Sequence, residues 1–106
     1  MKILFDQGTP APLRRELTGH DVATAFEVGW SDLVNGELLG RAEGVFDLLL
    51  TTDQNLPYQQ DLTNRKLAVL AMSTTSWPRI QRHVHLVVAA VNAIKPGEYI
   101  ELHIPE

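Results

Sequence analysis

The fold is decided by a short apolar run that closes on an acid, Leu48-Leu49-Leu50-Thr51-Thr52-Asp53. Its continuous apolar character is typical of a strand buried on both faces, as in a parallel sheet. The same pattern occurs earlier in the chain, where Ile3-Leu4-Phe5 closes on Asp6. Ligands bind outside the carboxyl ends of the strands in open α/β sheets, so both acids are predicted to lie at the ligand-binding edge.

Strand and helix patterns alternate along the rest of the chain. Strands are predicted over Lys2–Phe5, Asp21–Phe26, Phe46–Thr51, Leu67–Met72 and Glu98–Ile104, the last as a half-exposed edge strand. Helices are predicted from Thr9 to about Thr18, from Asn35 to Glu43 and from Trp77 to Ile94, and Asp53–Thr63 is predicted to be a loop with a short helix. Asn35 is the expected N-cap of the middle helix.

The alternation predicts one α/β domain spanning residues 1–106, with a mostly parallel five-stranded sheet. Because right-handed crossovers leave few topologies, the expected strand order is 2-1-3-4-5. Its switch point falls between the first and third strands. Those two strands end in Asp6 and Asp53, so the topology and the acids indicate the same place.

Composition excludes some kinds of site and partner. The chain has no cysteine, so it can form neither disulfides nor thiolate metal sites, which fits a cytoplasmic location. Its longest apolar runs, such as Leu67–Met72 and Leu86–Val91, are far shorter than the roughly 20 residues that span a bilayer, and no membrane partner is expected. The formal net charge of −4 argues against non-specific nucleic-acid binding over the whole surface.

Two carboxylates brought together at one sheet edge would repel each other by about 4 kcal/mol at a separation of ~4 Å. A divalent cation would relieve this repulsion, and Mg²⁺ and Mn²⁺ prefer carboxylate and water ligands. Glu37, early in the middle helix, is the predicted third acid, with Asp32 in reserve. Since aspartates at strand ends also cap turns, a purely structural role for Asp6 and Asp53 is the alternative.

A divalent cation bound by these acids would activate water and neutralise negative charge at a phosphodiester. Further candidate residues, for binding the substrate, flank the acids or carry positive charge. The predicted substrate-binding residues are Gln7, Thr52 and Asn55 beside the acids, and Arg79 and Arg82, three apart on the last helix. Trp30 and Trp77 could stack on bases or belong to the core.

Several stretches, taken in order, resemble the PIN-like nuclease superfamily. They are Gly19-His20-Asp21-Val22, Asn35-Gly36-Glu37-Leu38-Leu39, Arg41-Ala42-Glu43 and Leu49-Leu50-Thr51-Thr52-Asp53-Gln54-Asn55-Leu56. The chain looks most like a short bacterial branch known mainly as a domain of unknown function, and the resemblance runs from Met1 to about Ile104. It implies a three-layer α/β/α fold, acids that bind Mg²⁺ or Mn²⁺, and hydrolysis of RNA, often by toxins paired with an antitoxin.

Carried over residue by residue, Asp6 matches the first-strand acid of the superfamily, Glu37 the helix acid and Asp53 the acid after the third strand. Two departures from the superfamily pattern reduce the number of acidic residues at the site. Many PIN domains carry a further acid where this chain has Asn55, with Asp61 further along, and branch members often have an acid in place of Gln7. The resemblance also suggests a homodimer.

Two other functions stay open. A degenerate nuclease fold could serve only as a binding module, because a fold does not fix a function. The run from Asp47 to Pro57 also resembles the phosphoacceptor strand of signalling receivers, with Lys95-Pro96 like their lysine–proline pair. Against the receiver, Lys95 is expected at the wrong end of the sheet. His83 and His85 are interpreted as surface or packing residues, because positions two apart on one helix point in different directions.

Overall fold

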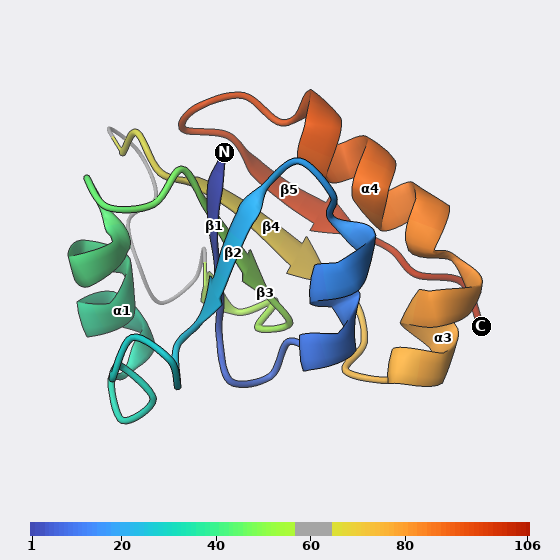
Figure 1. Cartoon of the computed structure of the whole chain (residues 1–106), viewed down its shortest axis with the longest axis horizontal. Coiled ribbons are helices and arrows are strands. Elements are labelled where there is room, and N and C mark those ends of the chain that lie inside the picture. The colour runs from blue at the N-terminus through green and yellow to red at the C-terminus, as the bar shows by residue number, and fades with distance from the viewer. Residues whose placement is uncertain (57–64) are drawn as a thin grey trace.

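The computed structural model describes residues 1–56 and 65–106 of the chain. In these residues a single five-stranded sheet has the order β2-β1-β3-β4-β5, and every pair of neighbouring strands is parallel (Figure 1). The strands are β1 (Lys2–Phe5), β2 (Asp21–Thr24), β3 (Leu48–Thr51), β4 (Ala68–Met72) and β5 (Tyr99–Leu102). The predicted α/β class and strand order are therefore confirmed, and the sheet is parallel throughout.

One face of the sheet is covered by α1 (Asn35–Ala42). Leu4, Leu49 and Val69 occupy paired positions on β1, β3 and β4, so their side chains project from the same face. They pack with the apolar side of α1, which carries Leu38 and Leu39. The apolar side of this helix is thus the side that packs on the sheet.

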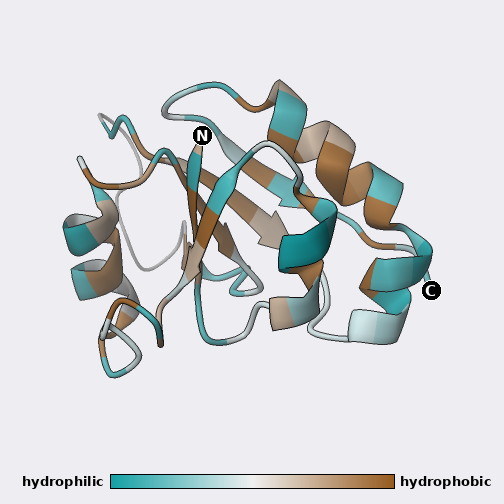
Figure 2. Ribbon diagram, in the orientation of Figure 1, coloured by the Kyte–Doolittle hydropathy of each residue, from teal (hydrophilic) through white to brown (hydrophobic). Residues whose placement is uncertain are grey.

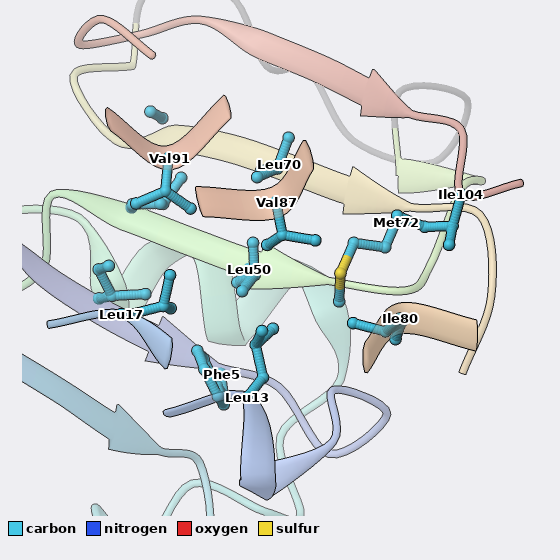
Figure 3. Packing of buried hydrophobic residues seen from close by; sticks show 13 residues of the cluster. Phe5, Leu13, Leu17, Leu50, Leu70, Met72, Ile80, Val87, Val91 and Ile104 are labelled. Carbon is cyan, nitrogen blue, oxygen red and sulfur yellow. The ribbon is translucent and has the colours of Figure 1, made fainter. Parts of the chain in front are cut away.

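The other face is covered by η1 (Ala11–Glu16), α3 (Trp77–Arg82) and α4 (Val84–Ala93). Phe5, Leu50 and Leu70 are paired across β1, β3 and β4 and project into this second core. Figure 3 shows that side chains from the helical segments lie over these strand residues. Those labelled in the figure include Leu13, Leu17, Ile80, Val87 and Val91. The sheet with helices on both faces forms a three-layer α/β/α fold.

Burial explains why the central strands are apolar at every position. Each residue of β3 and β4 is buried, because alternate side chains enter opposite cores. In Figure 2 these central strands are coloured mainly as hydrophobic, whereas polar residues interrupt the hydrophobic ones along α1 and α4. The continuous apolar runs in the sequence therefore follow from the layer architecture.

The connections between strands do not all have the same hand. η1 joins β1 to β2, and α3 with α4 joins β4 to β5, across the same face but in opposite directions along the sheet. α1 joins β2 to β3 across the other face, and this connection runs along the sheet in the direction opposite to the β1–β2 connection. Because both the face and the direction are reversed, these two connections have the same hand. The β4–β5 connection has the opposite hand. The right-handed rule behind the predicted order therefore cannot hold for all three connections.

The helix predicted from Trp77 to Ile94 is wrong in one respect, because the structure divides it in two. His83 has φ −122° and ψ 28°, outside the helical region, and separates α3 from α4. Ile80 before the break and Val87 and Val91 after it are all fully buried. The break thus lets both segments keep their apolar sides on the sheet.

Other boundaries also differ from the predictions. The first helix is only the short 3₁₀ segment η1. Pro10 precedes this segment, and Pro12 lies in its first turn. α1 begins at Asn35 itself with Val34 at the N-cap, so the predicted cap is wrong by one position. Ser76 caps α3, since its Oγ accepts a hydrogen bond from the Arg79 amide at 3.4 Å.

Two predictions lie partly or wholly outside the described residues. The loop and short helix predicted over Asp53–Thr63 fall partly in residues 57–64, and Asp61 falls within that segment.

None of the helices in the described part of the chain is both long and apolar enough to cross a bilayer.

We predict that Leu50→Ala lowers the free energy of unfolding by about 2–5 kcal/mol, because Leu50 is fully buried on the central strand β3. Urea unfolding followed by circular dichroism measures the change. Val45→Ala is the matched control, since Val45 is 49% exposed and its truncation should change stability by less than about 0.5 kcal/mol. Equal losses in the two variants would contradict the assigned core.

We predict that Gly97→Ala destabilises the protein more than Gly29→Ala. Both glycines have positive φ, 78° and 79°, so either alanine costs roughly 1–2 kcal/mol of backbone strain. Only at Gly97 would the new Cβ also meet backbone, the Arg65 carbonyl oxygen at 2.7 Å, whereas nothing lies within 4 Å at Gly29. Equal melting temperatures of the two variants would contradict this prediction, because the backbone around Gly97 would then accommodate the new Cβ atom without loss of stability.

Candidate functional site

Asp6 follows β1 directly and lies at the carboxyl edge of the sheet, as predicted. Its backbone amide donates to the Leu50 carbonyl at 3.2 Å, which extends the pairing of β1 with β3 by one residue. The residue is only 8% exposed. A carboxylate so nearly buried needs hydrogen-bond donors, because burying it unpaired would be costly.

Two threonine hydroxyls supply those donors. Thr9 Oγ1 lies 2.8 Å from Asp6 Oδ1, and Thr51 Oγ1 donates to Asp6 Oδ2. Thr9 Oγ1 also lies 2.8 Å from the Leu50 carbonyl oxygen, and its single proton serves one acceptor at a time. Both oxygens of the carboxylate are thereby held from the ends of two neighbouring strands, which fixes the side chain of Asp6.

Thr51 also connects Asp6 to Asp53. The Thr51 hydroxyl oxygen accepts a hydrogen bond from the Asp53 amide at 3.0 Å while it donates to Asp6. Asp53 Oδ1 in turn accepts from the Asn55 amide at 2.9 Å, which shapes the turn after β3. We call this series Asp6–Thr51–Asp53 the hydroxyl bridge. It joins the carboxylate of Asp6 to the backbone amide of Asp53 through one hydroxyl group.

The loops that carry the acids also pack closely. A Cβ atom on Gly8 would collide with the Thr52 hydroxyl, so a residue without a side chain lets the two loops approach. Thr52, a predicted substrate-binding residue, is half-buried in this contact, whereas Asn55 is exposed. The loops after β1 and β3 therefore form one structural unit.

The predicted third acid has a different environment. Glu37 is exposed in the first turn of α1, on the helix that covers the Leu4 and Leu49 face. Within residues 1–56 and 65–106, no three Asp, Glu, His or Cys side chains form a group that could hold a metal ion. A cation at Asp6 and Asp53 would need further ligands from water or from a substrate.

A hollow of about 390 Å³ opens beside Asp6, between the ends of β1 and β2. Gln7, predicted to bind substrate, lines it and spans it by donating from Nε2 to the Ser31 carbonyl. The polar lining residues are Asp6, Gln7, Thr9, Thr24 and Ser31, and the others are Ala11, Ala25 and Phe26. Phe26 is 81% exposed; its predicted place as the last residue of the second strand is wrong, because β2 ends at Thr24.

The turn that carries Phe26 is held by Glu27. The Thr24 amide donates to Glu27 Oε1 at 2.9 Å, and the Glu27 amide donates back to Thr24 Oγ1 at 3.1 Å. Both terminal nitrogens of Arg14 on η1 donate to the same carboxylate. Hydrogen bonds from Arg14 and then from the Thr24 amide lower the pKa of Glu27 to about 2, so the pair stays charged at neutral pH.

The two predicted phosphate contacts do not have equivalent environments. Arg79 is half-buried, and its Nη2 donates to the Ile104 carbonyl at 2.8 Å, so this guanidinium holds the segment after β5. Its Nε is buried with no hydrogen-bond partner in the described part of the chain. Arg82 is exposed at the end of α3 and is the more accessible cation.

Both tryptophans pack against other side chains. Trp30 meets Phe46 edge to face, with ring centroids 5.9 Å apart, and Trp77, the first residue of α3, packs against the core on that face. Because His83 lies at a helix break, the expectation that it points away from His85 is wrong, and their ring centroids lie 6.3 Å apart.

Lys95 lies where the receiver interpretation predicted a difficulty. It follows α4 and lines a hollow of about 670 Å³ with Phe46, Asp47, Lys66 and other residues at the amino ends of β3 and β4. Asp53 follows the carboxyl end of β3. The two residues are thus at opposite edges of the sheet, which argues against a receiver-like pair.

We predict that Thr51→Val lowers the free energy of unfolding by about 1–3 kcal/mol. The substitution keeps the shape but removes a donor to Asp6 and the acceptor of the Asp53 amide, and leaves both groups short of a partner. Chemical denaturation of Thr51→Val and of Thr18→Val, at an exposed site, measures the difference. A Thr51→Val protein as stable as Thr18→Val would disprove the structural importance of the hydroxyl bridge.

Comparison with known proteins finds no relative for this chain. No family model matches it, and no curated protein or solved structure matches it either. The resemblance to PIN-like nucleases therefore stays a prediction, and the site is defined by this chain's own contacts.

Proposed function

We propose that this protein is a ribonuclease that depends on Mg²⁺ or Mn²⁺ and cleaves at the edge where β1 and β3 end. The observation that carries the proposal is the hydroxyl bridge, which joins Asp6 and Asp53 through Thr51. Two acids at the carboxyl edge of a parallel sheet, next to its switch point, occupy the usual ligand position of α/β proteins.

The donor set suits a hard divalent cation. Its ligands would be the carboxylates of Asp6 and Asp53, and Mg²⁺ commonly uses only one or two protein carboxylates together with waters and substrate phosphate. Each carboxylate oxygen has two acceptor positions, so the bonds from Thr9 and Thr51 leave Asp6 with acceptor capacity. When bound, the cation would supply an activated water and neutralise negative charge at the scissile phosphodiester.

The chain's own residues would then orient the substrate. Asp6 is held by its two threonines, so its position would not change when RNA enters. Gln7, Thr52 and Asn55 border the acids, and Arg82 offers an exposed cation for a flanking phosphate. Glu37, exposed in the first turn of α1, belongs to the proposal as a third acid on the PIN-like resemblance alone.

The PIN-like resemblance extends this proposal to partners. Toxins of that superfamily are often paired with an antitoxin, and we include a cognate antitoxin and a homodimer in the proposal on that ground alone. Neither partner follows from the contacts described above.

A binding module that lacks catalysis is the second candidate. It is favoured by one observation, that the described residues contain no group of three side chains able to hold a metal ion. In this case Asp6 and Asp53 would only fix the loops after β1 and β3 through the hydroxyl bridge.

We predict that the wild-type protein cleaves single-stranded RNA with Mn²⁺ and not with EDTA, and that Asp53→Asn lowers the rate at least 100-fold. This is a loss of about 2.7 kcal/mol of transition-state stabilisation. Asp53 is better suited to this test than Asp6, because the more buried Asp6 also holds the fold. Cleavage is followed on a labelled oligonucleotide, and Mn²⁺ binding is measured by calorimetry on both proteins.

Asp21→Asn is the matched control for charge, since Asp21 is exposed at the amino end of β2. It should cleave at the wild-type rate. Equal cleavage by wild type and Asp53→Asn would rule out the proposed site. Binding of RNA with no Mn²⁺ binding and no cleavage would support the binding module instead.

A further inference from the structure

We propose that the hollow beside Asp6 binds one unpaired nucleobase, which stacks on the ring of Phe26. This inference rests on the proposed function only in that RNA is the ligand. The hollow lies between the ends of β1 and β2, next to the acids of the hydroxyl bridge but on the far side of Asp6 from β3. A base held there would place its own sugar and phosphate near the acids.

Phe26 is the first reason for this assignment. Its side chain is 81% exposed, the highest value among the large hydrophobic residues that are exposed in the described part of the chain. It lines the hollow, so an aromatic face is available at the rim. Stacking of a base on an aromatic side chain contributes about 1–3 kcal/mol and tolerates different bases.

The turn that presents Phe26 is rigidly held, which is the second reason. Ala25 donates to the Phe5 carbonyl at 2.8 Å, and Trp30 donates to the Ala25 carbonyl at 2.8 Å, so the turn is tied to β1 at one end and closed at the other. The Arg14–Glu27 ion pair fixes the residue that follows Phe26. The backbone that carries the ring is thus held before a ligand binds, so binding would have to order only the side chain of Phe26.

Charge separates a base from other ligands. Among the residues that the structure describes, Asp6 is the only charged residue that lines the hollow, and no lysine or arginine does, so an anionic phosphate would be repelled. A base is neutral and carries N–H donors on its edge. Gln7 Oε1 has no hydrogen-bond partner among residues 1–56 and 65–106 and could accept from such a donor. The volume of about 390 Å³ lies within the range of small-ligand sites.

The test is a nuclear magnetic resonance titration of the ¹⁵N-labelled full chain, in EDTA, with adenosine, cytidine and uridine in turn. Ribose is the control without a base, and N-acetylphenylalanine amide is the probe for a hydrophobic peptide partner. We expect saturable shifts of the Gln7, Ala25 and Phe26 amides with at least one nucleoside and none with ribose.

Variants of the ring test its role directly. Phe26→Ala should weaken nucleoside binding at least tenfold, and Phe26→Trp should retain it within about threefold, because it keeps an aromatic face. Both should fold, since the ring is exposed. Val45→Ala removes another exposed hydrophobic side chain, at the amino edge of the sheet, and should bind like the wild type.

Failure of the inference and failure of the proposed function give different results. Absence of nucleoside shifts, equal affinity of Phe26→Ala and wild type, or shifts with the peptide probe alone would overturn the nucleobase site. Because the titration contains no divalent metal, nucleoside binding that depends on Phe26 would support the site even if RNA is never cleaved. Mn²⁺-dependent cleavage whose KM is unchanged in Phe26→Ala would keep the function and reject the site.

Discussion

The hydrogen bond from the Thr51 hydroxyl to the Asp6 carboxylate is the interaction on which the carboxyl edge of this structure depends. It satisfies a charge that is almost buried, and it joins the ends of β1 and β3, which are the two strands at the switch point. The same hydroxyl accepts from the Asp53 amide, so the backbone of the second acid is tied to the carboxylate of the first. The geometry of the candidate site is therefore a consequence of satisfying one buried carboxylate.

This arrangement has two sides. Towards β3, the hydroxyl bridge ties the Asp6 carboxylate to the backbone amide of Asp53, the second acid of the proposed cation site. Towards β2, the hollow lined by Gln7 and Phe26 offers an aromatic face and hydrogen-bonding groups without a cation. Asp6 belongs to both sides, so a ligand that occupies the hollow would lie against the residue that anchors the acids.

Some of the predicted site follows directly from where the strands end. Asp6 and Asp53 lie after the carboxyl ends of β1 and β3, where the sequence placed them, because an apolar run that ends in an acid marks the end of a strand, although Asp6 itself stays buried. The environments of other candidates did not follow. Arg79 is half-buried and holds the Ile104 carbonyl, a contact between residues far apart in the chain that no local pattern indicates. Phe26 looked like a strand residue, and its exposure results from a turn closed by Glu27, Thr24 and the distant Arg14.

The sequence by itself determined the α/β class, the order of the five parallel strands and the edge at which the two acids lie. The class and the edge depend on the period of the apolar runs and on where those runs end, which are local properties of the chain. The strand order agrees with the one expected from right-handed crossovers, although the β4–β5 connection has the opposite hand. Only the tertiary structure decided the hand of the β4–β5 connection, the helix break at His83, the donors to Asp6 and the hollow beside Phe26. Each of these depends on which distant segments meet once the layers have packed, and a hydrophobic pattern does not specify that pairing.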